Sequence, residues 1–253
     1  MSPPDKVFLF IAGLHRSGTS ILHRCLADHP EVSGFSGTGV PEDEGQHLQS
    51  VFPPGREYGG AGLFGFAAAA HMTEEDASPE AAEQLWREWS PHWDTTRPVL
   101  LEKSPPNLLK TRYLQALFPR SAFVAMTRHP IAVALATSKW RRTTSLRRLV
   151  EHWLRCHEIY AADQAKLHRH VMLRYEDFVA APQRTLDDLC AFVELSPHRT
   201  ELTVESALND RYFARWDEVV GRRHAVRLRR FLESAEPRAN RFGYSLTDPR
   251  AVP

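Results

Sequence analysis

Short apolar segments alternate with longer segments of helical periodicity over residues 7–195. Four mostly apolar, β-rich segments are predicted to be buried strands: residues 7–12, 98–102, 122–127 and 170–174. Apolar positions spaced three and four apart predict helices over residues 77–89, 107–118, 145–167 and 182–195, and from Thr19 to the His29-Pro30 pair. Strands that alternate with helices predict a parallel sheet with right-handed crossovers.

Residues 33–65 interrupt this alternation and are rich in Gly, Pro and charged residues. We predict a loop here, with one short helix near residues 44–51; long irregular segments inside a domain are often functional. No repeat, low-complexity tract or linker divides the chain. The pattern therefore predicts a single domain over residues 1–253, with an α/β fold of three layers and a central parallel sheet of about four to five strands flanked by helices.

Composition and charge exclude several classes of function. Hydrophobic residues make up 42% of the chain, charged residues 25%, and the formal net charge is +1, which gives no reason to expect a nucleic-acid partner. No apolar run approaches the roughly 20 residues that span a bilayer, and the N-terminus lacks the features of a signal peptide, so we expect a cytoplasmic protein without a membrane span. The scattered Cys25, Cys156 and Cys190 are predicted to be buried thiols.

A glycine-bearing turn lies between the first predicted strand and the first predicted helix. Gly13 and Gly18 have the G-x4-G spacing of a nucleotide P-loop, and such a turn can hold a phosphate with backbone N–H groups and the positive end of the helix. Thr19 stands where a Walker loop has lysine, and Arg16 is the cation of the loop. The turn therefore predicts a P-loop-like phosphate site without the groups that a triphosphate and magnesium require.

The sequence GLHRSGTS, residues 13–20, resembles the 5′-phosphosulfate loop of sulfotransferases that use 3′-phosphoadenosine 5′-phosphosulfate (PAPS). The resemblance implies that six loop residues bind this donor: His15, Arg16, Ser17, Gly18, Thr19 and Ser20. It extends in order over residues 7–195. It implies transfer of a sulfuryl group to a hydroxyl or amine without a metal, with adenosine 3′,5′-bisphosphate as the by-product.

Residues 123–140, FVAMTRHPIAVALATSKW, resemble the element of this family that binds the 3′-phosphate of the donor, a strand that ends in Arg with a helix behind it. The resemblance assigns Arg128 to that phosphate, to which a guanidinium offers a fork of donors. The family usually has a serine eight residues later, where this chain has Ala136. Ser138 or Thr137 is the candidate substitute, unless the contact is absent.

Two further segments resemble parts of the same family. LEKSPPN, residues 101–107, is similar to the Glu-Lys-Ser/Thr-Pro stretch of carbohydrate-directed sulfotransferases, whose lysine lies by the transferring group. Negative charge grows on the bridging oxygen during sulfuryl transfer and a fixed cation stabilises it, so Lys103 and Arg16 are candidate catalytic residues. LRYEDF, residues 173–178, resembles a stretch near the adenine, which makes Tyr175 a candidate contact.

The acceptor must lose a proton as it attacks, so a general base is expected within hydrogen-bond reach. In the branches of this family that use Glu, the base lies somewhat more than twenty residues after the loop cation. That distance falls in PEDEGQH, residues 41–47. Glu42, Asp43, Glu44 and His47 are the candidates, and we prefer Glu44 because it begins the predicted short helix.

The sequence does not identify the acceptor, and a small molecule, a carbohydrate and a lipid stay open. Residues 34–95 are expected to form an insertion over the acceptor site, with many aromatic side chains for which we favour packing over a pocket. Two other hypotheses are a P-loop kinase or phosphotransferase that uses ATP and magnesium, and an inactive nucleotide-binding protein, which Ala136 would support. For Arg222, Arg223 and residues 241–246 a surface role is favoured over donor contacts.

Overall fold

The structure, a computed structural model, describes residues 6–205, 209–222 and 225–251. The described residues form one five-stranded sheet in the order β2-β3-β1-β4-β5, in which every neighbouring pair is parallel. The strands are β1 (Val7–Gly13), β2 (Val32–Gly34), β3 (Val99–Lys103), β4 (Ser121–Thr127) and β5 (His170–Arg174). β2 was not predicted, because three residues are too few to show a period of two.

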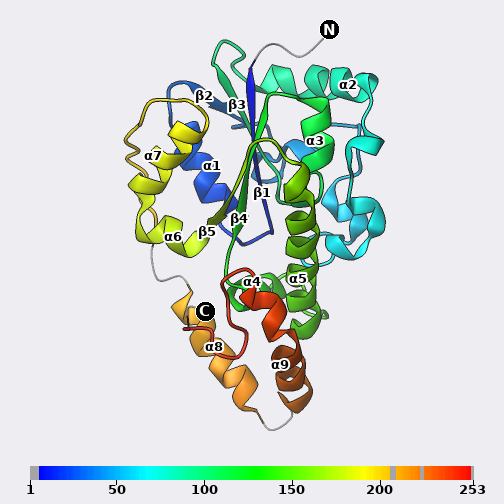
Figure 1. Cartoon of the computed structure of the whole chain (residues 1–253), viewed down its shortest axis with the longest axis vertical. Coiled ribbons are helices and arrows are strands. Elements are labelled where there is room, and N and C mark those ends of the chain that lie inside the picture. The colour runs from blue at the N-terminus through cyan, green and yellow to red at the C-terminus, as the bar shows by residue number, and fades with distance from the viewer. Residues whose placement is uncertain (1–5, 206–208, 223–224, 252–253) are drawn as a thin grey trace.

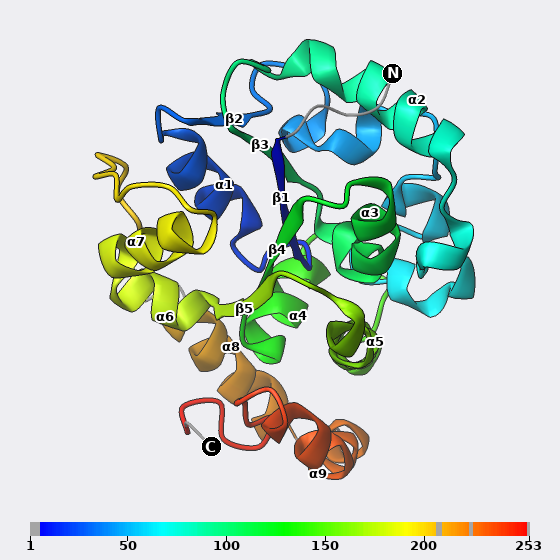
Figure 2. The ribbon, with the colours of Figure 1, turned by 45° about the horizontal axis from the view of Figure 1, so that its top comes forward.

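Helices cover both faces of this sheet (Figures 1 and 2). One face is covered by α1 (Thr19–Ala27), α6 (Tyr175–Ala180) and α7 (Pro182–Phe192). The other face and one end of the sheet are covered by α2 (Pro79–Trp89), α3 (Thr111–Leu117), α4 (Pro130–Ser138) and α5 (Leu146–Asp163). The predicted α/β fold, with a central parallel sheet between two layers of helices, is confirmed.

The register of the strands brings the candidate chemistry to one edge. Ile11 of β1 lies opposite Lys103 of β3, and Thr127 of β4 lies opposite Arg174 of β5. Because the carboxyl ends of parallel strands meet at the same edge of a sheet, the residues that follow β1, β3, β4 and β5 are neighbours in space. The phosphate loop therefore lies beside the end of β3.

The predicted helix over residues 44–51 is wrong. The chain there makes a single 3-10 turn, Gly45–His47, and then an irregular segment. The side chain of Gln49 accepts hydrogen bonds from the backbone N–H groups of Val51 and Phe52, at 2.7 and 2.8 Å. Because these N–H groups are bonded to the Gln49 side chain, they do not form the backbone hydrogen bonds of a helix. A polar side chain that bonds the backbone in this way competes with regular structure.

The aromatic residues that follow β2 pack into the core, as we favoured. Phe52, Phe64, Trp89 and Trp93 are buried, and Trp93 stacks on Phe35 with ring centroids 4.6 Å apart. The three cysteines are also buried as thiols. Most of the aromatic surface of residues 34–95 therefore stabilises the fold. Within the described part of the chain, no helix combines the length and apolar character that crossing a bilayer requires.

The C-terminal part forms two helices, α8 (Asp210–Gly221) and α9 (Val226–Asn240), which extend beyond the end of the sheet where α4 lies (Figure 1). The segment that follows α9 returns toward the sheet, and Tyr244 and Leu246 are buried. The expected surface role is therefore wrong for residues 244–246, which are buried, with the Tyr244 ring centroid 5.8 Å from that of Trp153 in α5, whereas Arg241 is exposed. Arg222 is exposed, and Arg223 lies outside the described residues.

Candidate active site

The turn between β1 and α1 forms a backbone loop at the carboxyl edge of the sheet. Gly18 has a φ of 103°, and a Cβ there would lie 2.5 Å from the Tyr175 ring and 2.9 Å from the Met126 sulfur, so glycine is required. Ser17 is buried, and its Oγ donates to the Leu14 carbonyl at 2.6 Å. The first N–H groups of α1 have no partner within the helix, so this loop can bind an anion.

A cavity of about 220 Å³ lies against this loop, and we call it the donor cavity. Five of the six predicted loop residues line it: His15, Arg16, Gly18, Thr19 and Ser20. Arg128 and Tyr175 line it as well. Burial lowers the pKa of His15, although the nearby Glu44 raises it, so the imidazole is neutral at neutral pH. The loop, the end of β4 and the start of α6 thus surround one space.

The guanidinium of Arg128 is anchored on two of its three nitrogens. Nε donates to Asn209 Oδ1 at 2.8 Å, and Nη1 donates to the Arg16 carbonyl at 3.0 Å. The third nitrogen, Nη2, is buried and has no hydrogen-bond partner among the described residues. The Tyr175 ring lies under the guanidinium, with 4.2 Å from Cζ to its centroid. A buried donor of this kind calls for an acceptor, which a bound anion would supply.

The two hydroxyls that were candidates to replace the family's serine lie elsewhere. Ser138 Oγ donates to the Leu135 carbonyl at 2.8 Å, inside α4. Thr137 is buried and lines a much smaller cavity beside His15 and His152. Neither belongs to the described residues that line the donor cavity. The structure therefore does not bring Ser138 together with Arg128 around this space.

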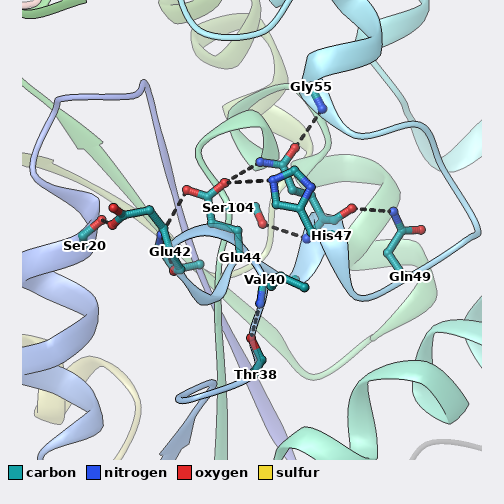
Figure 3. A network of polar contacts seen from close by, with 12 residues as sticks. Ser20, Thr38, Val40, Glu42, Glu44, His47, Gln49, Gly55 and Ser104 are labelled. Carbon is teal, nitrogen blue, oxygen red and sulfur yellow. Dashed lines mark hydrogen bonds and ion pairs between the residues drawn. The ribbon is translucent and has the colours of Figure 1, made fainter.

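A buried ion pair joins the end of β3 to the loop that follows β2, the loop whose Glu42, Glu44 and His47 are drawn in Figure 3. Lys103, which is 1% exposed, places Nζ 3.0 Å from Glu44 Oε1 and 3.0 Å from the Glu42 carbonyl. The other Glu44 oxygen, Oε2, accepts from Gln46 Nε2 at 2.5 Å. Glu44 also lines the donor cavity, so the ion pair lies next to the phosphate loop.

The other candidate bases are placed differently around Glu44. Glu42 is exposed and its Oε2 accepts from Ser20 Oγ at 3.1 Å. His47 is half-buried, with Nε2 3.9 Å from Glu44 Oε2, and burial lowers its pKa. Asp43 turns toward Thr38, whose backbone N and Oγ1 both donate to Asp43 Oδ1. Of these four side chains, Glu44 is the one in contact with Lys103.

Glu102, directly before Lys103, fixes the position of Glu44. Its Oε1 accepts from the Gly45 N–H at 2.9 Å and from Ser104 Oγ at 2.6 Å, and its Oε2 accepts from Asn107 Nδ2. Ser104 Oγ in turn accepts from the Gln46 N–H at 3.0 Å. The backbone on the C-terminal side of Glu44 is therefore bonded to the end of β3, the element that carries Lys103.

The buried Glu102 carboxyl is expected to stabilise the protein less as pH rises from about 4.5 to 7. Burial raises the pKa of Glu102 to about 7, against the opposing hydrogen bonds from Ser104 and Asn107. Because this pKa is higher in the folded state than in the unfolded chain, Glu102 holds its proton more tightly when folded, and up to about 3 kcal/mol of its contribution is lost across that window. Buried histidines whose pKa is lowered, such as His23, contribute in the opposite direction. In urea denaturation, the free energy of unfolding of the wild type minus that of Glu102→Gln should fall by up to about 3 kcal/mol from pH 4.5 to 7; a difference that does not change with pH would contradict this assignment.

A second cavity, of about 750 Å³, adjoins the donor cavity and runs between α1 and β2; we call it the polar groove. The two spaces share Ser20 and Glu42, and Lys103 lines the groove. His23 lines it too, and its buried Nε2 has no partner among the described residues. Burial lowers the pKa of His23 to about 4, so this ring is neutral at neutral pH. Charged side chains of both signs complete the lining: Arg24, Asp28, Asp43, Asp94 and Arg97.

Two residues of the donor site were not predicted from the sequence. Trp140 is 58% exposed, lines the donor cavity and lies over Arg16, with 5.0 Å from Cζ to the ring centroid. An isolated Trp beside basic residues, at the end of the predicted 3′-phosphate element, was the available signal for it. Asn209 contacts Arg128 from a distant part of the chain, and no local pattern marks it.

Comparison with known proteins agrees with this geometry. A model of the sulfotransferase family matches residues 9–199. The sulfotransferase domain of the olefin synthase from Synechococcus PCC 7002 is 19% identical, covers 85% of this chain and 89% of its own, and has a TM-score of 0.53. Sulfotransferase STF9 from Mycobacterium avium is 12% identical, covers 85% of this chain and 69% of its own, and has a TM-score of 0.54. The two structures support the fold, and the family match shows that this chain belongs to the sulfotransferase family, whose enzymes take a sulfuryl group from a donor.

Proposed function

We propose that this enzyme transfers the sulfuryl group of PAPS to a hydroxyl or amine of a polar acceptor, without a metal. The observation that supports this most is the meeting of three features at one edge of the sheet. They are the phosphate loop, the buried Lys103–Glu44 pair and the unpaired Nη2 of Arg128. When bound, PAPS supplies an activated sulfuryl group and leaves as adenosine 3′,5′-bisphosphate.

The residues of the donor cavity fit such a ligand. The loop backbone, the start of α1 and Arg16 would hold the 5′-phosphosulfate, because an anion is favoured at a helix N-terminus. Arg128 Nη2 would donate to the 3′-phosphate, and Tyr175, which lines the same cavity, would contact the adenosine. Ser138 is left out of the proposed contacts because its hydroxyl is bonded within α4.

Lys103 and Glu44 would carry the chemistry of the transfer. Lys103 Nζ, with Arg16, would stabilise the negative charge that grows on the bridging oxygen, and its position is fixed by Glu44 and the Glu42 carbonyl. Glu44 would take the proton of the attacking hydroxyl or amine. Its carboxylate is held by Lys103 and Gln46 and lies at the donor cavity next to the polar groove, so it needs little reorganisation.

Replacement of Glu44 by Gln is expected to lower turnover by about 100-fold, since a general base contributes roughly this much. The affinity for adenosine 3′,5′-bisphosphate should stay within about twofold, because the shape is kept, Glu44 is assigned no contact with the nucleotide, and the amide oxygen can still accept from one of the two donors, Lys103 or Gln46. Turnover with a permissive acceptor and calorimetric Kd values measure the two effects. Unchanged turnover would mean that the general base is Glu42, Asp43 or His47. Turnover of Glu42→Gln, Asp43→Asn and His47→Gln would then show which of the three it is.

The polar groove is the proposed route of the acceptor to Glu44 and Lys103. It adjoins the donor cavity, whereas the aromatic side chains of residues 34–95 that were candidates for an apolar pocket are largely packed in the core. Its lining offers charged groups of both signs and the unpartnered His23 nitrogen, which favours an acceptor with several hydrogen-bonding groups over an apolar one.

Binding of the by-product tests this proposal before any acceptor is known. Adenosine 3′,5′-bisphosphate at about 100 times its Kd should stabilise the protein by about 2.7 kcal/mol, with or without magnesium. ADP and ATP, each with and without magnesium, are the comparison ligands in the same thermal unfolding assay. A shift with ATP and magnesium alone would contradict the proposal and favour a phosphotransferase. Binding of the bisphosphate with no label transfer from PAPS to any acceptor, or to water, would favour an inactive nucleotide-binding protein.

A further inference from the structure

The C-terminal helices contact the donor site through residues outside the segment that the family model matches. That segment ends at residue 199. Asn209, directly before α8, is hydrogen-bonded to Arg128. The centroid of the Tyr212 ring in α8 lies 5.6 Å from the Arg128 Cζ. Tyr244, beyond α9, is buried next to His129. Three separate positions of this part of the chain thus surround the end of β4.

A network of hydrogen bonds fixes the orientation of the Asn209 amide. Its Nδ2 donates to Glu176 Oε1 at 2.6 Å, and the His129 N–H donates to the same oxygen at 3.0 Å. The other oxygen of Glu176 accepts from the Tyr244 hydroxyl at 2.8 Å. With Nδ2 held by Glu176, Oδ1 is the atom that faces Arg128 Nε. The Asn209 amide is therefore oriented from outside the donor cavity.

The neutral Asn209 amide lies between the Glu176 carboxylate and the Arg128 guanidinium and bonds to both. No hydrogen bond or ion pair between described residues joins Glu176 directly to Arg128. A carboxylate bonded to Arg128 would neutralise the guanidinium and compete with a bound phosphate for its donors. Asn209 instead bonds Nε without adding negative charge, and the Arg16 carbonyl does the same for Nη1. The remaining nitrogen, Nη2, keeps its capacity to donate.

We propose that Asn209 is a positioning residue for recognition of the donor's 3′-phosphate, and that the C-terminal helices thereby form part of the donor site. The proposal rests on the proposed use of PAPS. Asn209 fixes the guanidinium of Arg128 in the plane that the Tyr175 ring supports, and leaves Nη2 free for the phosphate. Loss of Asn209 would let the side chain rotate, and a negative charge at that position would oppose the phosphate.

The test compares two nucleotides that differ in the 3′-phosphate, adenosine 3′,5′-bisphosphate and adenosine 5′-monophosphate, by calorimetry. Asn209→Ala should raise the Kd of the bisphosphate about tenfold, the size of one hydrogen bond to a charged group. Asn209→Asp keeps an acceptor for Nε but should weaken the bisphosphate by at least as much, because it adds negative charge. The Kd of the monophosphate should stay within about twofold in both. Asp217→Asn, in the exposed ion pair of α8 with Arg250, is the control and should change neither Kd.

Several outcomes would overturn the inference. It fails if Asn209→Ala changes both Kd values equally or changes neither, or if Asn209→Asp binds the bisphosphate like the wild type. In an Arg128→Ala background, Asn209→Ala should raise the Kd of the bisphosphate no further, whereas general unfolding of α8 would add to the loss. If the wild-type protein itself binds the bisphosphate no more tightly than the monophosphate, the proposed function fails, and that result is distinct from failure of the role of Asn209.

Discussion

Replacement of Lys103 by Met is expected to lower turnover by about 1,000-fold and to raise the Kd of adenosine 3′,5′-bisphosphate by about tenfold. Lys103 is fixed at the end of β3, with Nζ 3.0 Å from Glu44 Oε1 and 3.0 Å from the Glu42 carbonyl. A preorganised cation or donor at the point where charge develops contributes about 10²–10³-fold to the rate. When the S–O bond breaks, the bridging oxygen stays on the 5′-phosphate, so the by-product keeps a charged oxygen beside Lys103, and the variant loses one charged hydrogen bond to it, about tenfold in Kd. Transfer of labelled sulfate and calorimetry measure the two quantities.

The same change affects folding, and a double variant separates the two effects. Without Lys103, the Glu44 carboxylate stays buried without its partner charge, which costs about 3 kcal/mol of the free energy of unfolding. Lys103→Met combined with Glu44→Gln removes both charges and should recover most of that stability in urea denaturation. Turnover should stay at the level of Lys103→Met or below. A stable double variant with near-normal turnover would contradict a catalytic role for either residue.

The parts of the site that could be predicted are those in which chemistry and local structure lie in one segment. The turn over residues 13–20 carries its glycines, its cation and the start of its helix together, so both its backbone form and its anion site follow from eight residues. Lys103 ends one mostly apolar strand, and Arg128 directly follows another. Strand ends of a parallel sheet share one edge, so their proximity follows from the predicted fold.

The parts that could not be predicted depend on contacts between distant segments. Glu44 was preferred as the start of a helix that does not form, and it is instead held by Lys103 and Gln46, with the next N–H, that of Gly45, bonded to Glu102. Several carboxylates in one polar loop have the same local pattern, and the contact with Lys103 is what distinguishes Glu44 from them. Asn209 is still harder to predict, since 81 positions separate it from Arg128. An isolated Asn has no period, spacing or motif that would mark it.

Replacement of Arg128 by Ala is expected to weaken binding of PAPS and of adenosine 3′,5′-bisphosphate by about 300-fold. Truncation of one partner of a buried, charged hydrogen bond costs about 2–5 kcal/mol. Arg128 is 6% exposed and its Nη2 has no other partner among the described residues, so the 3′-phosphate would lose its main buried donor. The affinity for adenosine 5′-phosphosulfate, which lacks that phosphate, should change by less than about threefold, since its other contacts are made by the loop.

The contrast between the two nucleotides makes this prediction independent of folding. The Arg128 backbone is held by Trp153 Nε1, which donates to the Arg128 carbonyl at 2.9 Å, so the end of β4 should keep its place when the side chain is removed. A distorted loop would weaken both nucleotides, whereas loss of a 3′-phosphate contact weakens one. Arg24→Ala, an exposed arginine of α1 that lines the polar groove, is the matched control and should leave both affinities unchanged. If Arg128→Ala weakened the binding of both nucleotides equally, the role of Arg128 would be to support the loop through its hydrogen bond to the Arg16 carbonyl. Another residue would then have to bind the 3′-phosphate.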